Sequence, residues 1–260
     1  MMRGIWDRET VALLLIVAYL PLAGFWLWYG GAEALARFAL AVLVVAVWNL
    51  TFLLARAQVP SLVGVLTAFA FAMLAPTDIG AFRLVLGLSF GIVVGELIFG
   101  GWGRNVVNPA TIALAFMGFG FPGFDWPDFV TPVIWAAIPV VVLGMAMGLM
   151  AASQIVSAMA IACACYWMGL APFDALLLAG LVFVLLGLDP VTSPSTVLGS
   201  WLGGGLYAGL VVLFAAGWDG AAVVQYAVAA ALLTSLSAPL LDEIALALWV
   251  TQRRRRHGRT

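Results

Sequence analysis

Residues 10–29, TVALLLIVAYLPLAGFWLWY, contain no charged side chain. They are long enough to cross a bilayer, because a membrane helix needs about 20 mainly apolar residues. The run lacks the small-residue cleavage site of a secretory signal, so we interpret it as a first membrane helix. Further apolar runs predict about ten transmembrane helices in an all-α polytopic membrane protein: 34–55, 60–75, 83–99, 109–121, 132–150, 152–169, 174–188, 198–216 and 221–250.

The composition of the whole chain agrees with this interpretation. Its 260 residues are 65% hydrophobic and 9% charged, with a mean hydropathy of +1.15, whereas soluble domains carry about 25% charged residues. The chain is therefore not a soluble globular, disordered or nucleic-acid-binding protein. One histidine, His257, and two cysteines are too few for a metal centre within this chain.

The cysteines, Cys163 and Cys165, lie two residues apart in an apolar run. On a helix this spacing places them on different faces, so one metal ion could not readily take both. We interpret them as buried small residues. A cluster shared with another subunit is the alternative.

The arginines indicate the topology. All 11 basic residues are arginines, and cytoplasmic loops of membrane proteins are enriched in positive charge. With both termini in the cytoplasm, ten crossings leave only Arg37 and Arg83 outside, together with Asp125, Asp128 and Asp219. The cytoplasmic side then holds Arg3, Arg8, Arg56, Arg104 and the Arg-rich tail, residues 253–260.

A weak internal repeat divides the chain. Residues 85–91, VLGLSFG, resemble residues 197–203, VLGSWLG, and each follows a short apolar run that ends in a turn containing Asp-Ile or Asp-Pro. Five helices per half would place the halves in inverted orientation, an arrangement that locates ligands near the repeat interface. We expect a single transmembrane domain, residues 1–260, with halves of about 10–121 and 132–250.

The first polar stretch inside the apolar body is Gly100–Thr111, GGWGRNVVNPAT. Asn108 followed by Pro109 is typical of a helix N-terminus. Such a terminus beside Arg104, Asn105 and Asn108 could hold an anionic or amide-rich ligand. The alternative is an ordinary cytoplasmic loop with a capped helix.

The second polar stretch is Asp189–Thr196, DPVTSPST, which precedes a glycine-rich helix. Asp189, Thr192 and Ser193 offer donors and acceptors that would suit the polar edge of an isoalloxazine ring. The alternative is a turn whose side chains cap its own backbone.

Three motifs resemble one family. GLSFGIVVG (87–95) with FGGWGRN (99–105) and NPA (108–110), then DPVTS (189–193), then SAPLLD (237–242) occur in the order found in the B subunit of the sodium-translocating NADH:quinone oxidoreductase. They are also similar to the D subunit of the Rnf electron-transport complex. The resemblance implies a urea-transporter-like fold of two inverted five-helix repeats in the bacterial cytoplasmic (inner) membrane, with other membrane subunits as partners.

Two positions depart from the family pattern. The family attaches FMN to the threonine of a Ser-Gly-Ala-Thr motif, but residues 121–132 contain no such motif, and Thr131, their only hydroxyl residue, precedes a proline. We therefore expect no covalent FMN. Where relatives often carry Lys followed by Glu or Gln, this chain has Glu96-Leu97, and an acid inside a membrane span is a candidate for an ion pathway.

These observations favour a subunit of a redox-driven ion-translocating complex, without a catalytic residue assigned to this chain. It would relay electrons through non-covalent FMN or riboflavin or support neighbouring cofactors. The site residues would be Arg104, Asn105, Asn108, Asp189, Thr192 and Ser193, with Glu96 on an ion pathway. Two alternatives are a small-solute or ion permease of urea-transporter-like fold, and a structural or assembly subunit without a cofactor.

Overall fold

A computed structural model describes residues 7–218 and 220–257, and within these residues all regular structure is helical. Arg3, Asp219 and the last residues of the predicted tail, 258–260, lie outside the described residues. The helices are α1 (Arg8–Arg56), α2 (Val63–Leu74), α3 (Gly80–Ile92), α4 (Pro109–Gly120), α5 (Thr131–Trp135), α6 (Ala137–Ala146), α7 (Ala152–Trp167), α8 (Phe173–Val182), α9 (Val197–Gly217) and α10 (Val223–His257). Two π-helical turns, η1 (Val93–Leu97) and η2 (Phe183–Gly187), extend α3 and α8.

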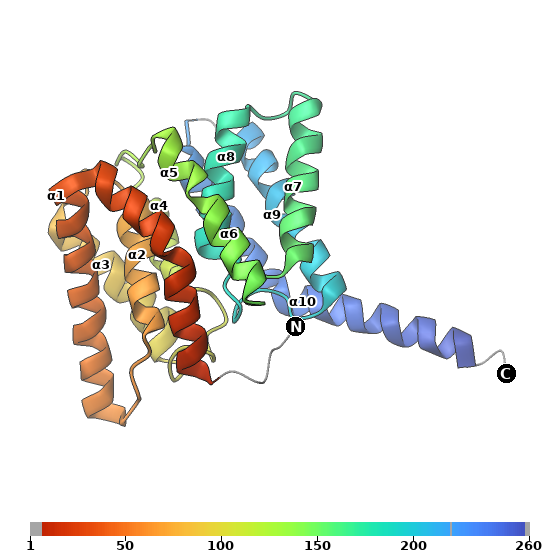
Figure 1. Cartoon of the computed structure of the whole chain (residues 1–260), viewed down its shortest axis with the longest axis horizontal. Helices are drawn as coiled ribbons and strands as arrows, with labels where there is room; N and C mark the ends of the chain where they lie inside the picture. The colour runs from red at the N-terminus through yellow and green to blue at the C-terminus, as the bar shows by residue number, and fades with distance from the viewer. Residues whose placement is uncertain (1–6, 219, 258–260) are drawn as a thin grey trace.

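Helix α1 is two apolar runs joined at Gly31. A straight helix of its 49 residues would be about 74 Å long, more than twice the thickness of a bilayer core. Gly31 adopts φ 58° and ψ −144°, a conformation open essentially only to glycine, and this reverses the chain. Figure 1 shows the two runs leading away from one bend, so that both ends of α1 lie at the same end of the molecule.

Four helical stretches are long and apolar enough to cross a membrane in the described part of the chain: Arg8–Arg56, Gly80–Leu97, Val197–Gly217 and Val223–Arg253. Between them lie shorter apolar helices, including α2, α4 and the α8–η2 stretch, which correspond to the predicted spans 60–75, 109–121 and 174–188. The chain is thus an all-helical, multi-pass membrane protein.

The helices gather into two groups. Helices α1 to α4 pack together on one side of the molecule, α7 and α9 pack on the other, and α10 contacts α9, α8 and α4 before it leaves the bundle (Figure 1). Helix α2 lies in the middle of the first group and is buried along nearly its whole length. The two groups therefore meet along α1, α6, α8 and α10.

The connections separate into two ends of the bundle. At one end Arg37 donates to the carbonyl groups of Ala75 and Pro76 at 2.9 Å. The backbone amide of Thr77 donates to the backbone carbonyl of Asp125 at 3.0 Å at the same end. At the other end the guanidinium of Arg8 lies 6.0 Å from the centre of the Trp102 ring. The loop 98–108 therefore shares its end with the start of α1.

Replacing Gly31 by alanine tests the break in α1. We expect Gly31→Ala to lower the free energy of unfolding by about 1–3 kcal/mol, because alanine strains this backbone conformation. Thermal unfolding in detergent measures the change. Gly24→Ala is the matched control, since Gly24 lies in the same element with open space around its Cβ position, and equal destabilisation by both variants would contradict this account.

Candidate functional site

The two polar stretches meet at one hydrogen bond. The side-chain amide of Asn108 donates to Oδ2 of Asp189 at 3.3 Å, across 81 positions of sequence. Asn108 opens the short helix α4, and Asp189 follows the π turn η2. The contact thus joins the helix group of α1–α4 to the group that contains α8 and α9.

Asn108 is held in place by the helix that it caps. Its backbone is extended, with φ −60° and ψ 128°, and its Oδ1 accepts the amide proton of Ala110 at 2.9 Å. The preceding loop turns at Gly100, Gly101 and Gly103, whose φ values of 99°, 93° and 95° favour glycine. With Oδ1 committed to the cap, only the amide nitrogen of Asn108 is left to bind Asp189.

Arg104 and Asn105 have other roles in this loop. Asn105 is 5% exposed and bonds within the loop, accepting from the amide of Gly103 at 3.1 Å and donating to the carbonyl of Val107 at 3.3 Å. Arg104 is exposed. Asn105 therefore shapes the loop, and Arg104 is available at its surface.

Asp189 organises the start of the second loop. Its Oδ1 accepts from the amide of Val191 at 3.1 Å, and its Oδ2 accepts from the hydroxyl of Thr192 at 3.3 Å as well as from Asn108. The hydroxyl of Ser193 donates to the Asp189 carbonyl at 2.6 Å. Thr192 and Ser193 thus support Asp189 instead of reaching across to the first loop.

Burial and hydrogen bonding have opposite effects on the pKa of Asp189. Burial raises the pKa of Asp189 above its ordinary value, and hydrogen bonds from Val191, Thr192 and Asn108 lower it. Burial dominates, so Asp189 binds a proton more readily than an exposed aspartate.

A second carboxylate, Asp242 of α10, fixes the end of the same loop. One oxygen accepts from the amide and hydroxyl of Ser195, both at 2.8 Å, and the other accepts from the amide and hydroxyl of Thr196 at 2.9 and 2.5 Å. The Thr196 hydroxyl in turn caps α9 through the amide of Gly199 at 3.0 Å. Asp242 was not among the predicted site residues, although it belongs to the SAPLLD motif.

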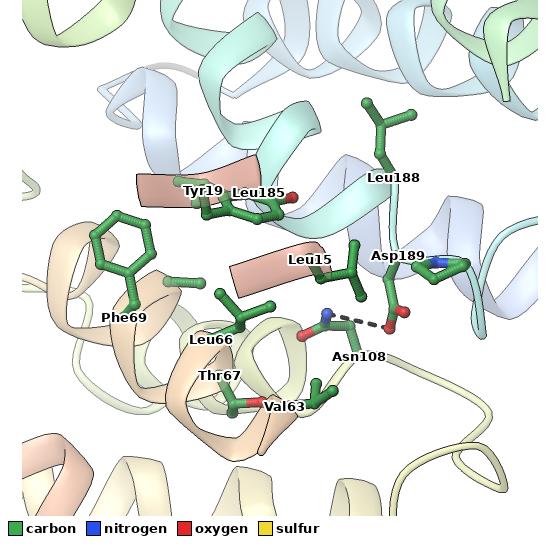
Figure 2. Close-up of a pocket in the computed structure, with 12 residues that line it drawn as sticks. Leu15, Tyr19, Val63, Leu66, Thr67, Phe69, Asn108, Leu185, Leu188 and Asp189 are labelled. Carbon is green, nitrogen blue, oxygen red and sulfur yellow. Dashed lines mark hydrogen bonds between the residues drawn. The ribbon is translucent and has the colours of Figure 1, made fainter. Parts of the chain in front are cut away.

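A small cavity of about 30 Å³ lies beside the Asn108–Asp189 contact (Figure 2). Its wall includes Leu15 and Tyr19 of α1, Thr67 of α2, Asn108 and Asp189. The other four predicted site residues do not line it: Arg104, Asn105, Thr192 and Ser193. A water molecule needs about 10–15 Å³ by this measure. The cavity has room for one or two water-sized groups, and the three fused rings of a flavin do not fit in it.

Glu96 lies in the π turn η1 and is 3% exposed. Its backbone carbonyl accepts from the amides of Phe99 and Gly101 at 3.2 and 3.1 Å, so the turn leads directly into the first polar loop. Among the described residues no cationic group lies within 4.0 Å of its carboxyl group. Glu96 is thus a buried acid without an ion pair in that part of the chain.

The cysteines correct one expectation. Cys163 is exposed and Cys165 is half-buried, so the interpretation of both as buried residues is wrong. Helix α7 lies at the edge of the bundle (Figure 1), and its buried residues lie in its first half, before the cysteines. In the described residues no group of three or more His, Cys, Asp or Glu side chains could hold a metal ion.

The fold and this contact define a polytopic membrane protein with a polar site between two broken helices. The model of the NQR2, RnfD, RnfE family matches residues 3–132, half of the chain, and the chain belongs to this family. That range contains Glu96, Arg104, Asn105 and Asn108. Asp189, Thr192, Ser193 and Asp242 lie beyond it.

The chain is also similar to curated relatives whose names match this family. The chain is 34% identical over 109 residues to the B subunit of the Na(+)-translocating NADH-quinone reductase of Stutzerimonas stutzeri, covering 42% of this chain and 26% of the relative. It is 36% identical over 93 residues to the corresponding protein of Yersinia pestis, covering 36% and 22%. The chain thus matches about a quarter of the length of these relatives.

The contribution of Asp242 to the stability of the protein can be measured by comparison with Glu243. We expect Asp242→Ala to lower the free energy of unfolding by about 2–3 kcal/mol, because hydrogen bonds to a charged group contribute about 1.5–3 kcal/mol and four donors lose their partner. Thermal unfolding in detergent gives the value. Glu243→Ala is the control, since Glu243 is exposed, and a loss no larger than the control's would contradict the assigned role.

Proposed function

We propose that the chain is an integral membrane subunit of a redox-driven ion-translocating complex. The observation that supports this most strongly is the Asn108–Asp189 contact, which places a half-buried carboxyl group between two broken helices in a member of this family. Broken helices and intramembrane acids are characteristic of ion and proton pathways. The names of the relatives, subunits of a Na(+)-translocating NADH-quinone reductase, point to the same class of complex.

The proposed pathway includes Asp189 and Glu96. Both carboxyl groups lie at the end of a π turn, next to a polar loop, at the end of the bundle that also holds Arg8 and Trp102. The cavity beside Asp189 is sized for water or a small ion. We propose that these two acids bind the transported ion or its replacement proton, while other subunits supply partners for electron transfer.

Any flavin bound by this chain would lie outside the cavity. The cavity is too small for the ring, and the Ser-Gly-Ala-Thr acceptor is absent, so we propose that any FMN or riboflavin bound by this chain is non-covalent. The exposed Arg104 would offer positive charge to such a group at the surface of the first loop. When bound, a flavin would supply one-electron and two-electron transfer.

Ion transport by membrane vesicles tests the proposed function. In inverted vesicles that contain the whole complex, we expect Asp189→Ala to reduce ion uptake driven by NADH oxidation at least tenfold, because the proposed ion ligand is removed. Glu243→Ala should transport like the unchanged protein. Ion uptake that needs no electron donor would instead identify a permease, and full uptake by Asp189→Ala would indicate an assembly subunit.

The absorbance of the purified complex tests the flavin proposal. We expect the flavin band in the visible region to disappear from this chain after denaturation and gel filtration, because no covalent acceptor is present. Fluorescent flavin that stays with the denatured chain would contradict this, and Thr131 would then be the first residue to replace.

We further propose ten crossings in two inverted five-helix halves, with both termini in the cytoplasm of a bacterial cell. Support comes from the positions of the arginines, since Arg8, Arg56 and Arg104 share one end of the bundle, whereas Arg37 and Arg83 lie toward the other. Reporter fusions at Thr260 should be active in the cytoplasm. An external C-terminus would exclude this topology.

A further inference from the structure

The π turn η2 is unusual because three other helices supply hydrogen bonds to the backbone of α8–η2. The hydroxyl of Tyr207 in α9 donates to the carbonyl of Ala179 at 2.8 Å, and the side-chain amide of Gln154 in α7 donates to the carbonyl of Gly187 at 3.0 Å. The hydroxyl of Tyr19 in α1 donates to the carbonyl of Val184. All three donors are more than nine-tenths buried.

These bonds matter because a π turn is rarely stable by itself. It holds one residue more per turn than an α-helix, and it usually occurs where the surrounding structure maintains it. Conversion of η2 to α-helix would rotate the residues that follow by about 100° and move them about 1.5 Å along the axis. Asp189 lies two residues after η2, so its carboxyl group would leave the amide of Asn108.

Tyr19 is the donor that links η2 to the helix group containing Asn108, whereas Gln154 and Tyr207 donate from α7 and α9. The acceptor of Tyr19, Val184, lies inside η2, five residues before Asp189, whereas the acceptor of Tyr207 lies ten residues before it. Tyr19 also belongs to the helix group that contains Asn108, and it lines the same cavity as Asp189 (Figure 2). A single hydroxyl thus connects α1 with the turn that directs the carboxyl group.

We propose that Tyr19 is a positioning residue for Asp189: its hydrogen bond to Val184 maintains η2 as a π turn and so directs the Asp189 carboxyl group to Asn108. The inference rests on the proposed function only because that proposal assigns Asp189 to the ion pathway. It assigns to Tyr19 no contact with an ion or cofactor.

Carbodiimide labelling tests the proposal on the protein purified in detergent. Dicyclohexylcarbodiimide reacts with protonated carboxyl groups in apolar surroundings, and mass spectrometry of the peptide that contains Asp189 measures the labelled fraction. Loss of the Asn108 donor favours the protonated acid, so we expect Tyr19→Phe to raise the labelling of Asp189 several-fold. Labelling depends on neither electron transfer nor ion movement, so its outcome is separate from that of the proposed function.

Tyr207→Phe is the matched control. It removes the same atom from a buried tyrosine that donates to the same helical stretch, but farther from Asp189. We expect Asp189 labelling in Tyr207→Phe to equal that of the unchanged protein. Equal increases in both variants would show general loosening and overturn the proposal, as would unchanged labelling in Tyr19→Phe.

The double variant gives a second criterion. Asn108→Ser keeps an oxygen that can cap α4 but removes the side-chain amide that reaches Asp189, since the serine side chain is shorter. If Tyr19 acts through this contact, Tyr19→Phe should add no further labelling in the Asn108→Ser background, and additive increases would overturn the proposal. Should Tyr19→Phe fail to accumulate, fluorotyrosine at position 19, a stronger donor, should lower the labelling, and no decrease would overturn it.

Discussion

Backbone groups released by broken helices must find hydrogen-bond partners inside an apolar body, and this constraint organises the molecule. An unsatisfied backbone group in a membrane costs several kcal/mol. The end of α2 is satisfied by Arg37, which donates to the carbonyls of Ala75 and Pro76. The start of α4 is satisfied by Asn108, and the carbonyls of Val184 and Gly187 in η2 are satisfied by Tyr19 and Gln154. Arg37, Tyr19 and Gln154 thus join different helices at such breaks.

The same constraint explains why the loop 189–196 needs two acids. The segment contains two prolines, which prevent it from continuing α8–η2 as a regular helix, so its amides need side-chain acceptors. Asp189 takes the donors at its start and Asp242 takes those at its end. Asp242 is fully engaged with Ser195 and Thr196, whereas Asp189 also binds Asn108 and borders a cavity. Asp242 therefore maintains the loop, and Asp189 is the acid free to respond to its surroundings.

The positions of the helices could be predicted because they depend on local sequence. The predicted span 109–121 corresponds to α4, which begins at Pro109 because Asn108 supplies its cap, and 174–188 corresponds to α8–η2. The hydrogen bond between Asn108 and Asp189 joins one residue from each of the two polar stretches. The division of roles within each stretch was not predictable, because whether Asn105 bonds to its own loop or to a distant one depends on backbone angles at Gly100, Gly101 and Gly103.

The features that were missed depend on contacts between distant residues. Tyr19 and Val184 are 165 positions apart, and Ser195 and Asp242 are 47 apart, so no local pattern relates them. The π turns could not be predicted either, because their sequences, VVGEL and FVLLG, contain no pattern that separates a π turn from an α-helix. Because both turns lead into the polar loops, the residues most relevant to the site are held by the part of the fold that local sequence specifies least. Asp189 and Glu96 are therefore better understood as groups positioned by neighbouring helices than as members of a linear motif.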